Sequence, residues 1–184
     1  MTPKPFKVII AGGSIAGLSL ALMLGKNGID FLVLKAYPSI APQVGASIGL
    51  LPTVLRSLDQ LGCYESVMEM AEYSMDKKNF NQNMTGRHGY PIVFFERRML
   101  IHILYDKTQG KSKVLTSRRV QTVYTSQSHV TVTTTEGQSY KGGIVVGADG
   151  IHSTIRRQMW EEARKIDPSE ENGMQSLNIK ATPG

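Results

Sequence analysis

The chain has 184 residues, of which 41% are apolar and 20% charged, and its formal net charge is +6. This length and composition predict a globular chain whose core buries roughly two thirds of the unfolded surface. The single cysteine, Cys63, excludes an intramolecular disulfide. Together with four scattered histidines it also excludes a zinc site of familiar spacing. We therefore expect no metal and a reducing, cytoplasmic environment.

An uncharged run at 8–24 is too short and too rich in glycine for a membrane span, and no signal-peptide cleavage pattern follows it. Membrane association is therefore not indicated. Basic residues gather between 87 and 119, but no recognisable nucleic-acid-reading motif accompanies them. We expect a solvated face there with at most one or two phosphate contacts, and no nucleic-acid partner.

Residues 6–34 predict a βαβ unit. The apolar, β-branched stretch 6–11 is typical of a buried strand, and 18–24 is typical of a buried helix that stops near Gly28. A second apolar strand is expected at 29–34. Because the helix provides the crossover, the two strands should be parallel.

The turn between the first strand and the helix predicts a dinucleotide site. In such a turn Gly12 allows a sharp bend, the third position admits a pyrophosphate to the backbone, and Gly17 lets the helix pack on the strand. The helix N-terminus then offers free N–H groups to phosphates. One position departs from the usual pattern, because Ser14 replaces the second glycine. Its small hydroxyl can itself donate to a phosphate.

A second departure lies at the end of the second strand. Dinucleotide folds usually place Asp or Glu there to hold the ribose hydroxyls, whereas this chain has Lys35. Loss of a charged hydrogen bond of about 1.5 to 3 kcal/mol would weaken adenosine binding by roughly one to two decades. Alternatively, a lysine could favour a 2′-phosphate, which indicates NADP.

The later part of the chain predicts more strands. Segments 120–125 and 129–135 have strand composition, a turn is expected at 136–137, and a short buried strand at 144–146 runs into the loop 147–150. A helix is expected at 151–165. The predicted fold class is α/β, a Rossmann-like domain with a parallel sheet and an antiparallel β-meander.

Three motifs carry a family resemblance. They are Gly12-Gly13-Ser14-Ile15-Ala16-Gly17-Leu18, then Arg97-x-x-Leu100-x-x-x-Leu104, then Gly147-Ala148-Asp149-Gly150-x-x-Ser153-x-x-Arg156. In this order they resemble the group A FAD-dependent monooxygenases. The segment 43–52 looks closest to the PaxM-like fungal branch, which makes meroterpenoids and indole diterpenes. The resemblance runs from about Phe6 to Ser169.

The resemblance implies FAD as cofactor, NAD(P)H as co-substrate, and a small hydrophobic, prenylated or terpenoid substrate. The implied reaction is epoxidation or hydroxylation of a prenyl chain with O₂. No catalytic side chain is expected, because the flavin performs the oxygen transfer. The cofactor-binding residues implied by the motifs and the turn are Gly12, Gly13, Ser14, Ala16, Gly17, Lys35, Gly49, Arg97, Asp149, Gly150 and Arg156.

The resemblance also implies that later parts are missing. Members of the family contribute a Gly-Asp motif from their later half, and this chain contains no Gly-Asp dipeptide. Residues 170–184 are polar and without periodicity, which is typical of an irregular tail. We therefore expect a partial FAD-binding domain at 1–169, the N-terminal part of a larger flavoprotein fold. The alternative is a non-catalytic truncated remnant with weak nucleotide binding.

Several of these motifs also allow other interpretations. The segment 45–49 satisfies G-x-S-x-G, but Pro42 and Pro52 argue against the strand and helix that a hydrolase elbow needs. Asp149 with His152 and Ser153 contains triad residue types at a spacing too short to converge. Without the family, Asp149 is a helix cap and Arg97 a charged helix start. An NADP-dependent reductase that uses Lys35 is a third hypothesis.

Overall fold

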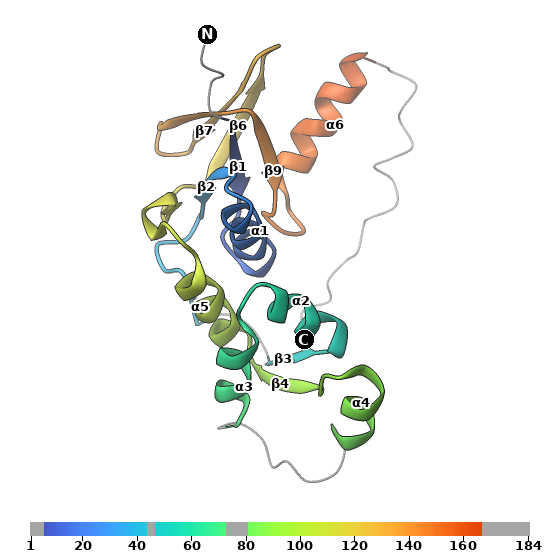
Figure 1. The fold of residues 1–184 in the computed structure, drawn as a ribbon. Coiled ribbons are helices and arrows are strands. Elements are labelled where there is room, and N and C mark those ends of the chain that lie inside the picture. Colours follow the sequence, from blue (N-terminus) through green and yellow to red (C-terminus); the bar gives the residue numbers. More distant parts are fainter. Residues whose placement is uncertain (1–5, 44–46, 73–80, 167–184) are drawn as a thin grey trace, which may run out of the picture.

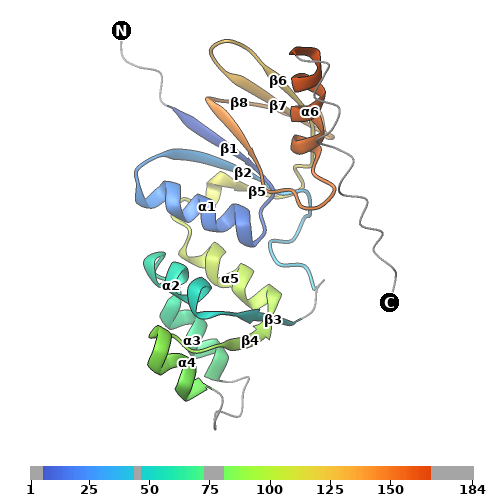
Figure 2. The ribbon, with the colours of Figure 1, turned by 90° about the vertical axis from the view of Figure 1, so that its right-hand side faces the viewer.

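The computed structural model describes residues 6–43, 47–72 and 81–166 (Figure 1). The expected tail at 170–184 therefore lies outside the described residues. Figure 2 shows the elements as layers, with an antiparallel sheet at the top, a parallel sheet and helix α1 below it, and a mainly helical layer at the bottom. Within the described ranges, no helix has the length and apolar character needed to cross a membrane.

The parallel sheet confirms the predicted βαβ unit. Strand β1 (Lys7–Ala11), helix α1 (Ile15–Lys26) and β2 (Asp30–Leu34) follow one another, and the sheet order is β5-β2-β1-β9. The outer strands are β5 (Val114–Leu115) and β9 (Ile144–Gly147). All three pairings are parallel. Gly28, expected as the helix stop, has a φ of +68°.

Strand β1 is buried on both faces, which explains its continuous apolar sequence. Val8 and Ile10 belong to a core that includes residues of α1 and of the helical layer below. Ile9 and Ala11, which alternate with them, belong to a smaller core under the antiparallel sheet. The parallel sheet therefore separates two cores and contributes to both.

The predicted β-meander is also confirmed. It consists of β6 (Val120–Thr125), β7 (Val130–Thr134) and β8 (Ser139–Gly142), paired antiparallel in that order. Val130 and Val132 are buried, whereas Thr131 and Thr133, which alternate with them, are partly exposed. Helix α6 (Thr154–Ile166) lies beside β6, where the Gln158 side chain binds the backbone of Gln121 and Val123.

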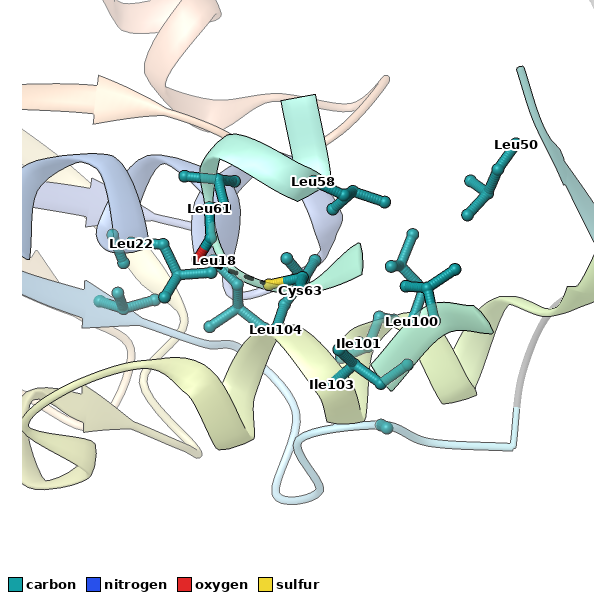
Figure 3. Close-up of a cluster of buried hydrophobic side chains, with 14 of the residues drawn as sticks. Leu18, Leu22, Leu50, Leu58, Leu61, Cys63, Leu100, Ile101, Ile103 and Leu104 are labelled. Carbon is teal, nitrogen blue, oxygen red and sulfur yellow. Dashed lines mark hydrogen bonds between the residues drawn. The ribbon is translucent and has the colours of Figure 1, made fainter. Parts of the chain in front are cut away.

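The bottom layer was not anticipated in detail. It contains α2 (Pro52–Gln60), α3 (Tyr64–Glu72), α4 (Asn81–His88), α5 (Arg97–Lys107) and the antiparallel pair β3 (Ser47–Leu50) and β4 (Val93–Glu96), and a 3₁₀ turn (Lys111–Lys113) follows α5. Figure 3 shows how its core is filled by Leu58, Cys63, Leu100 and Leu104. Ser47 is the first residue of strand β3, so it does not occupy the strand-to-helix turn of a hydrolase elbow.

Helix α1 offers a test of the close contact between helix and strand. A Cβ on Gly17 would lie 1.8 Å from the Gly12 carbonyl oxygen, whereas a Cβ on Gly25 of the same helix would meet only Phe31 at 3.6 Å. We expect Gly17→Ala to lower the free energy of unfolding by at least about 2 kcal/mol. Gly25→Ala should be neutral or stabilising by up to about 1 kcal/mol. Urea unfolding of both variants checks this, and equal effects would contradict the proposed packing.

Candidate functional site

The carboxyl ends of the four parallel strands converge on one cavity of about 400 Å³. The residues that directly follow β1, β2 and β9 line it, and so does the segment after β5. In open α/β sheets, ligands bind outside the carboxyl ends of strands, where the chain turns to opposite sides of the sheet. Here that point lies at β1, whose neighbours are β2 and β9.

The glycine turn forms one wall of this cavity and leaves no room for a side chain. Gly12 has a φ of +110°, and a Cβ there would lie 2.1 Å from the carbonyl oxygen of Ala148. Its N–H donates to the carbonyl of Leu34 at 2.8 Å, and the N–H of Ala148 donates to the carbonyl of Ala11 at 2.7 Å. The turn is thus fixed on both sides by neighbouring strands.

Helix α1 presents its N-terminus to the cavity. Ser14 is the N-cap residue, in extended conformation, and its carbonyl accepts the first helical hydrogen bond, from Leu18, at 2.9 Å. The Ser14 hydroxyl does not cap the helix; instead it accepts a hydrogen bond from Nη2 of Arg97 at 2.5 Å. The first amides of the helix have no partner within the helix, and with Arg97 beside them they form a site suited to an anion.

Lys35 lines the cavity, and its side chain bends toward the glycine turn. It is only 5% exposed, and its Nζ donates to the carbonyl oxygen of Gly13 at 3.0 Å. Its backbone is held between β5 and the following segment, because its N–H binds Leu115 and its carbonyl binds Arg118. Burial of the side chain lowers the pKa of Lys35 below its usual value, and the nearby positive charge of Arg97 lowers it further.

Asp149 caps helix α6. Its carboxylate accepts hydrogen bonds from the Ser153 hydroxyl at 2.5 Å and from the N–H groups of Thr154 and Ile155 at 2.7 and 3.3 Å. The Ser153 hydroxyl in turn accepts from the N–H of Arg156 at 2.9 Å. These bonds are those of a helix N-terminus, and they leave no base-to-nucleophile arrangement in this segment.

Two arginines from the basic stretch 87–119, which the sequence predicts to be a solvated face with at most one or two phosphate contacts, lie at the cavity. Arg118 is held by Tyr140, to whose hydroxyl its Nε donates at 2.9 Å, and by the carbonyl of Ser117. Arg119 is exposed, with its guanidinium carbon 5.8 Å from the ring centroid of Tyr37. The basic composition of 87–119 was the available signal, but it did not show which of these residues lie at the cavity.

The structure brings most of the expected site residues together. Those that line the cavity are Gly12, Gly13, Ser14, Lys35, Arg97, Asp149 and Gly150. Gly17 is buried in helix packing, and Ala16 is exposed on the first turn of α1. Gly49 lies in β3 against the ring of Phe94, and the Arg156 side chain binds the carbonyl of Ile151. These last four residues are outside the lining of the cavity.

Comparison with known families decides the assignment. Residues 5–183 match the family described as FAD binding domain. The chain belongs to this family. The predicted resemblance to fungal FAD-dependent monooxygenases is confirmed as well: the chain is 44% identical over 179 residues to the FAD-dependent monooxygenase olcE of Penicillium canescens and 45% identical over 181 residues to spyC of Aspergillus fumigatus.

Each of these two alignments covers 91% of this chain but only 38% of the relative. The chain therefore spans about two fifths of the length of these relatives. Among solved structures it is similar to the R204Q variant of Klebsiella pneumoniae HpxO complexed with FAD, with a TM-score of 0.68 and 25% identity over 83% of this chain and 42% of that chain. The flavin-dependent monooxygenase PieE, at 16% identity and a TM-score of 0.72 over 87% of this chain and 33% of that chain, shares the fold.

The lowered pKa of Lys35 gives a pH prediction. Between that lowered value and its ordinary 10.5, the unfolded chain binds a proton that the folded chain has released. The free energy of unfolding should therefore rise with pH across this window. Lys35→Gln keeps a hydrogen-bond donor for Gly13 but cannot lose this proton. Its free energy of unfolding should therefore rise less with pH than that of the wild type.

Urea unfolding of both proteins from neutral pH to 10.5 measures the difference. Lys141→Gln is the control, since Lys141 is exposed on β8 and should follow the wild type. Identical pH profiles for the wild type and Lys35→Gln would contradict the prediction.

Proposed function

We propose that the cavity binds the ADP part of FAD, and that the chain carries the FAD-binding part of a monooxygenase of fungal secondary metabolism. The observation that supports this most is the contact of Gly12 and Gly17 with the backbone around them. Neither glycine carries a side chain that could cover the first turn of α1, and Arg97 is bonded to Ser14 beside that turn. A bound diphosphate is stabilised by this combination of free backbone N–H groups and a nearby cation.

The residues present fit the diphosphate. The amides at the start of α1, the Ser14 hydroxyl and the Arg97 guanidinium would hold the phosphate oxygens. Asp149 accepts hydrogen bonds at the start of α6, and it lines the cavity together with Gly150. When bound, FAD would supply the redox chemistry that activates oxygen, and the role of these residues is to bind and orient it.

The substrate and the reductant belong to the same proposal. The relatives olcE and spyC are named FAD-dependent monooxygenases, which supports oxygenation as the reaction of the full-length protein. Similarity of segment 43–52 to the PaxM-like branch supports a prenylated or terpenoid substrate, with epoxidation or hydroxylation of its prenyl chain. NAD(P)H is the proposed source of electrons.

One observation favours the alternative of a remnant that binds nucleotide weakly. Lys35 occupies the position where a carboxylate usually accepts hydrogen bonds from the adenosine ribose, and an ammonium group can only donate. Its Nζ is bonded to Gly13 instead. The proposed binding of FAD must therefore depend more on the diphosphate than on the ribose.

Binding of FAD tests the proposal directly, with two adjacent arginines as a matched pair. Arg97 contacts Ser14 at the turn, whereas Arg98 forms an ion pair with Glu96. We expect Arg97→Gln to weaken FAD binding by about tenfold or more, since a charged hydrogen bond contributes about 1.5 to 3 kcal/mol. Arg98→Gln should bind as the wild type does. Quenching of flavin fluorescence gives both dissociation constants, and no binding by the wild type at high micromolar FAD would reject the proposal.

A second variant examines the ribose position. Lys35→Glu restores an acceptor for the ribose hydroxyls, so FAD affinity should rise by about tenfold or more. In the absence of ligand the same change should lower the melting temperature, because a buried carboxylate then faces the carbonyl of Gly13. Titration calorimetry and thermal unfolding measure the two effects, and an unchanged FAD affinity would show that Lys35 does not limit binding.

A further inference from the structure

Four cationic side chains and one carboxylate line the cavity. The cations are Lys35, Arg97, Arg118 and Arg119, and the carboxylate is that of Asp149. Asp149 is already bonded to the Ser153 hydroxyl and to the N–H groups of α6. A plain diphosphate bound at α1 would meet Arg97, which leaves positive charge at the other end of the cavity without an anionic partner in the described part of the chain.

Two of these cations converge on one aromatic ring. Nζ of Lys35 lies 5.9 Å and the guanidinium carbon of Arg119 lies 5.8 Å from the ring centroid of Tyr37. Among the described residues no carboxylate forms an ion pair with either of them. Lys35 is 5% exposed, so its charge lies in a region that water screens poorly. Two cations that line one cavity without a carboxylate partner favour an anion in that cavity.

The position of Lys35 identifies which anion. It directly follows β2, and the residue at the end of this strand faces the adenosine ribose in dinucleotide folds, where basic side chains accommodate a ribose phosphate. We propose that the Tyr37 end of this cavity, through Lys35 and Arg119, is a subsite for a phosphate group on the adenosine ribose. The chain would then prefer adenine nucleotides that carry this third phosphate over those that do not.

This inference rests on the proposed nucleotide site but not on FAD as its occupant. A ribose phosphate carries a charge of about −1.5 to −2 near neutral pH, so it can take hydrogen bonds from both cations. It would also offset the two factors that lower the pKa of Lys35, its burial and the charge of Arg97. Arg118 contributes less, because its guanidinium is already bonded to Tyr140 and Ser117.

Two pairs of probes, which differ by a single phosphate, test the subsite in the full chain. NADP⁺ against NAD⁺ reports a 2′-phosphate, and coenzyme A against dephospho-coenzyme A reports a 3′-phosphate. We expect at least one phosphorylated member to bind about tenfold more tightly or better by titration calorimetry. The preference should shrink as salt is raised, because part of the subsite is exposed. Equal affinities within both pairs overturn the inference.

Variants locate the effect. Lys35→Gln should abolish the preference, and Arg119→Gln, on an exposed side chain whose loss should not affect folding, should reduce it about threefold. Lys141→Gln should leave it unchanged, since Lys141 is exposed on β8 away from the cavity. A preference that survives both Lys35→Gln and Arg119→Gln overturns the assignment to these residues.

FAD measured in parallel separates this inference from the proposed function. Binding of FAD with equal affinities within both probe pairs rejects the subsite and leaves the proposed function standing. A phosphate preference without binding of FAD supports the subsite and rejects FAD as the occupant. If no nucleotide binds at all, both are rejected.

Discussion

The site depends on one close backbone contact, at Gly12, where no side chain would fit. Its Cα packs against the carbonyl of Ala148, and its own carbonyl packs against Gly17 in the helix. The ends of β1 and β9 and the first turn of α1 therefore meet in a space that only glycine fits. Because this contact sets the direction of α1, it also sets where the free amides point and where an anion can be held.

The parts of the fold that the sequence predicts are those with a local signal. The βαβ unit combines two continuous apolar strands with a glycine turn, and β6 was expected with the bounds it has. The bottom layer lacks such a signal. Strands β3 and β4 have four residues each and pair across the intervening helices, as Ile48 does with the backbone of Phe95, and no periodicity in either segment indicates its partner.

The candidate site also has some parts that the sequence predicts and others that it does not. The glycines and Ser14 follow one another in sequence, so their arrangement can be inferred from spacing alone. Arg118 and Arg119 reach the cavity because β5 pairs with β2, which is a tertiary contact that spacing does not reveal. The position of Lys35 was evident from the strand that precedes it. Its hydrogen bond back to Gly13 was not, since this depends on how deeply the side chain is buried.

Arg97 is the first residue of α5, and it follows β4 without an intervening loop. Through Ser14 it joins the helical layer to the phosphate-binding turn, although the two parts are far apart in sequence. The first residue of α5 therefore lies directly beside the first turn of α1. A cofactor held at that turn would touch both layers at once, so a single side chain is enough to make the helical layer part of the site.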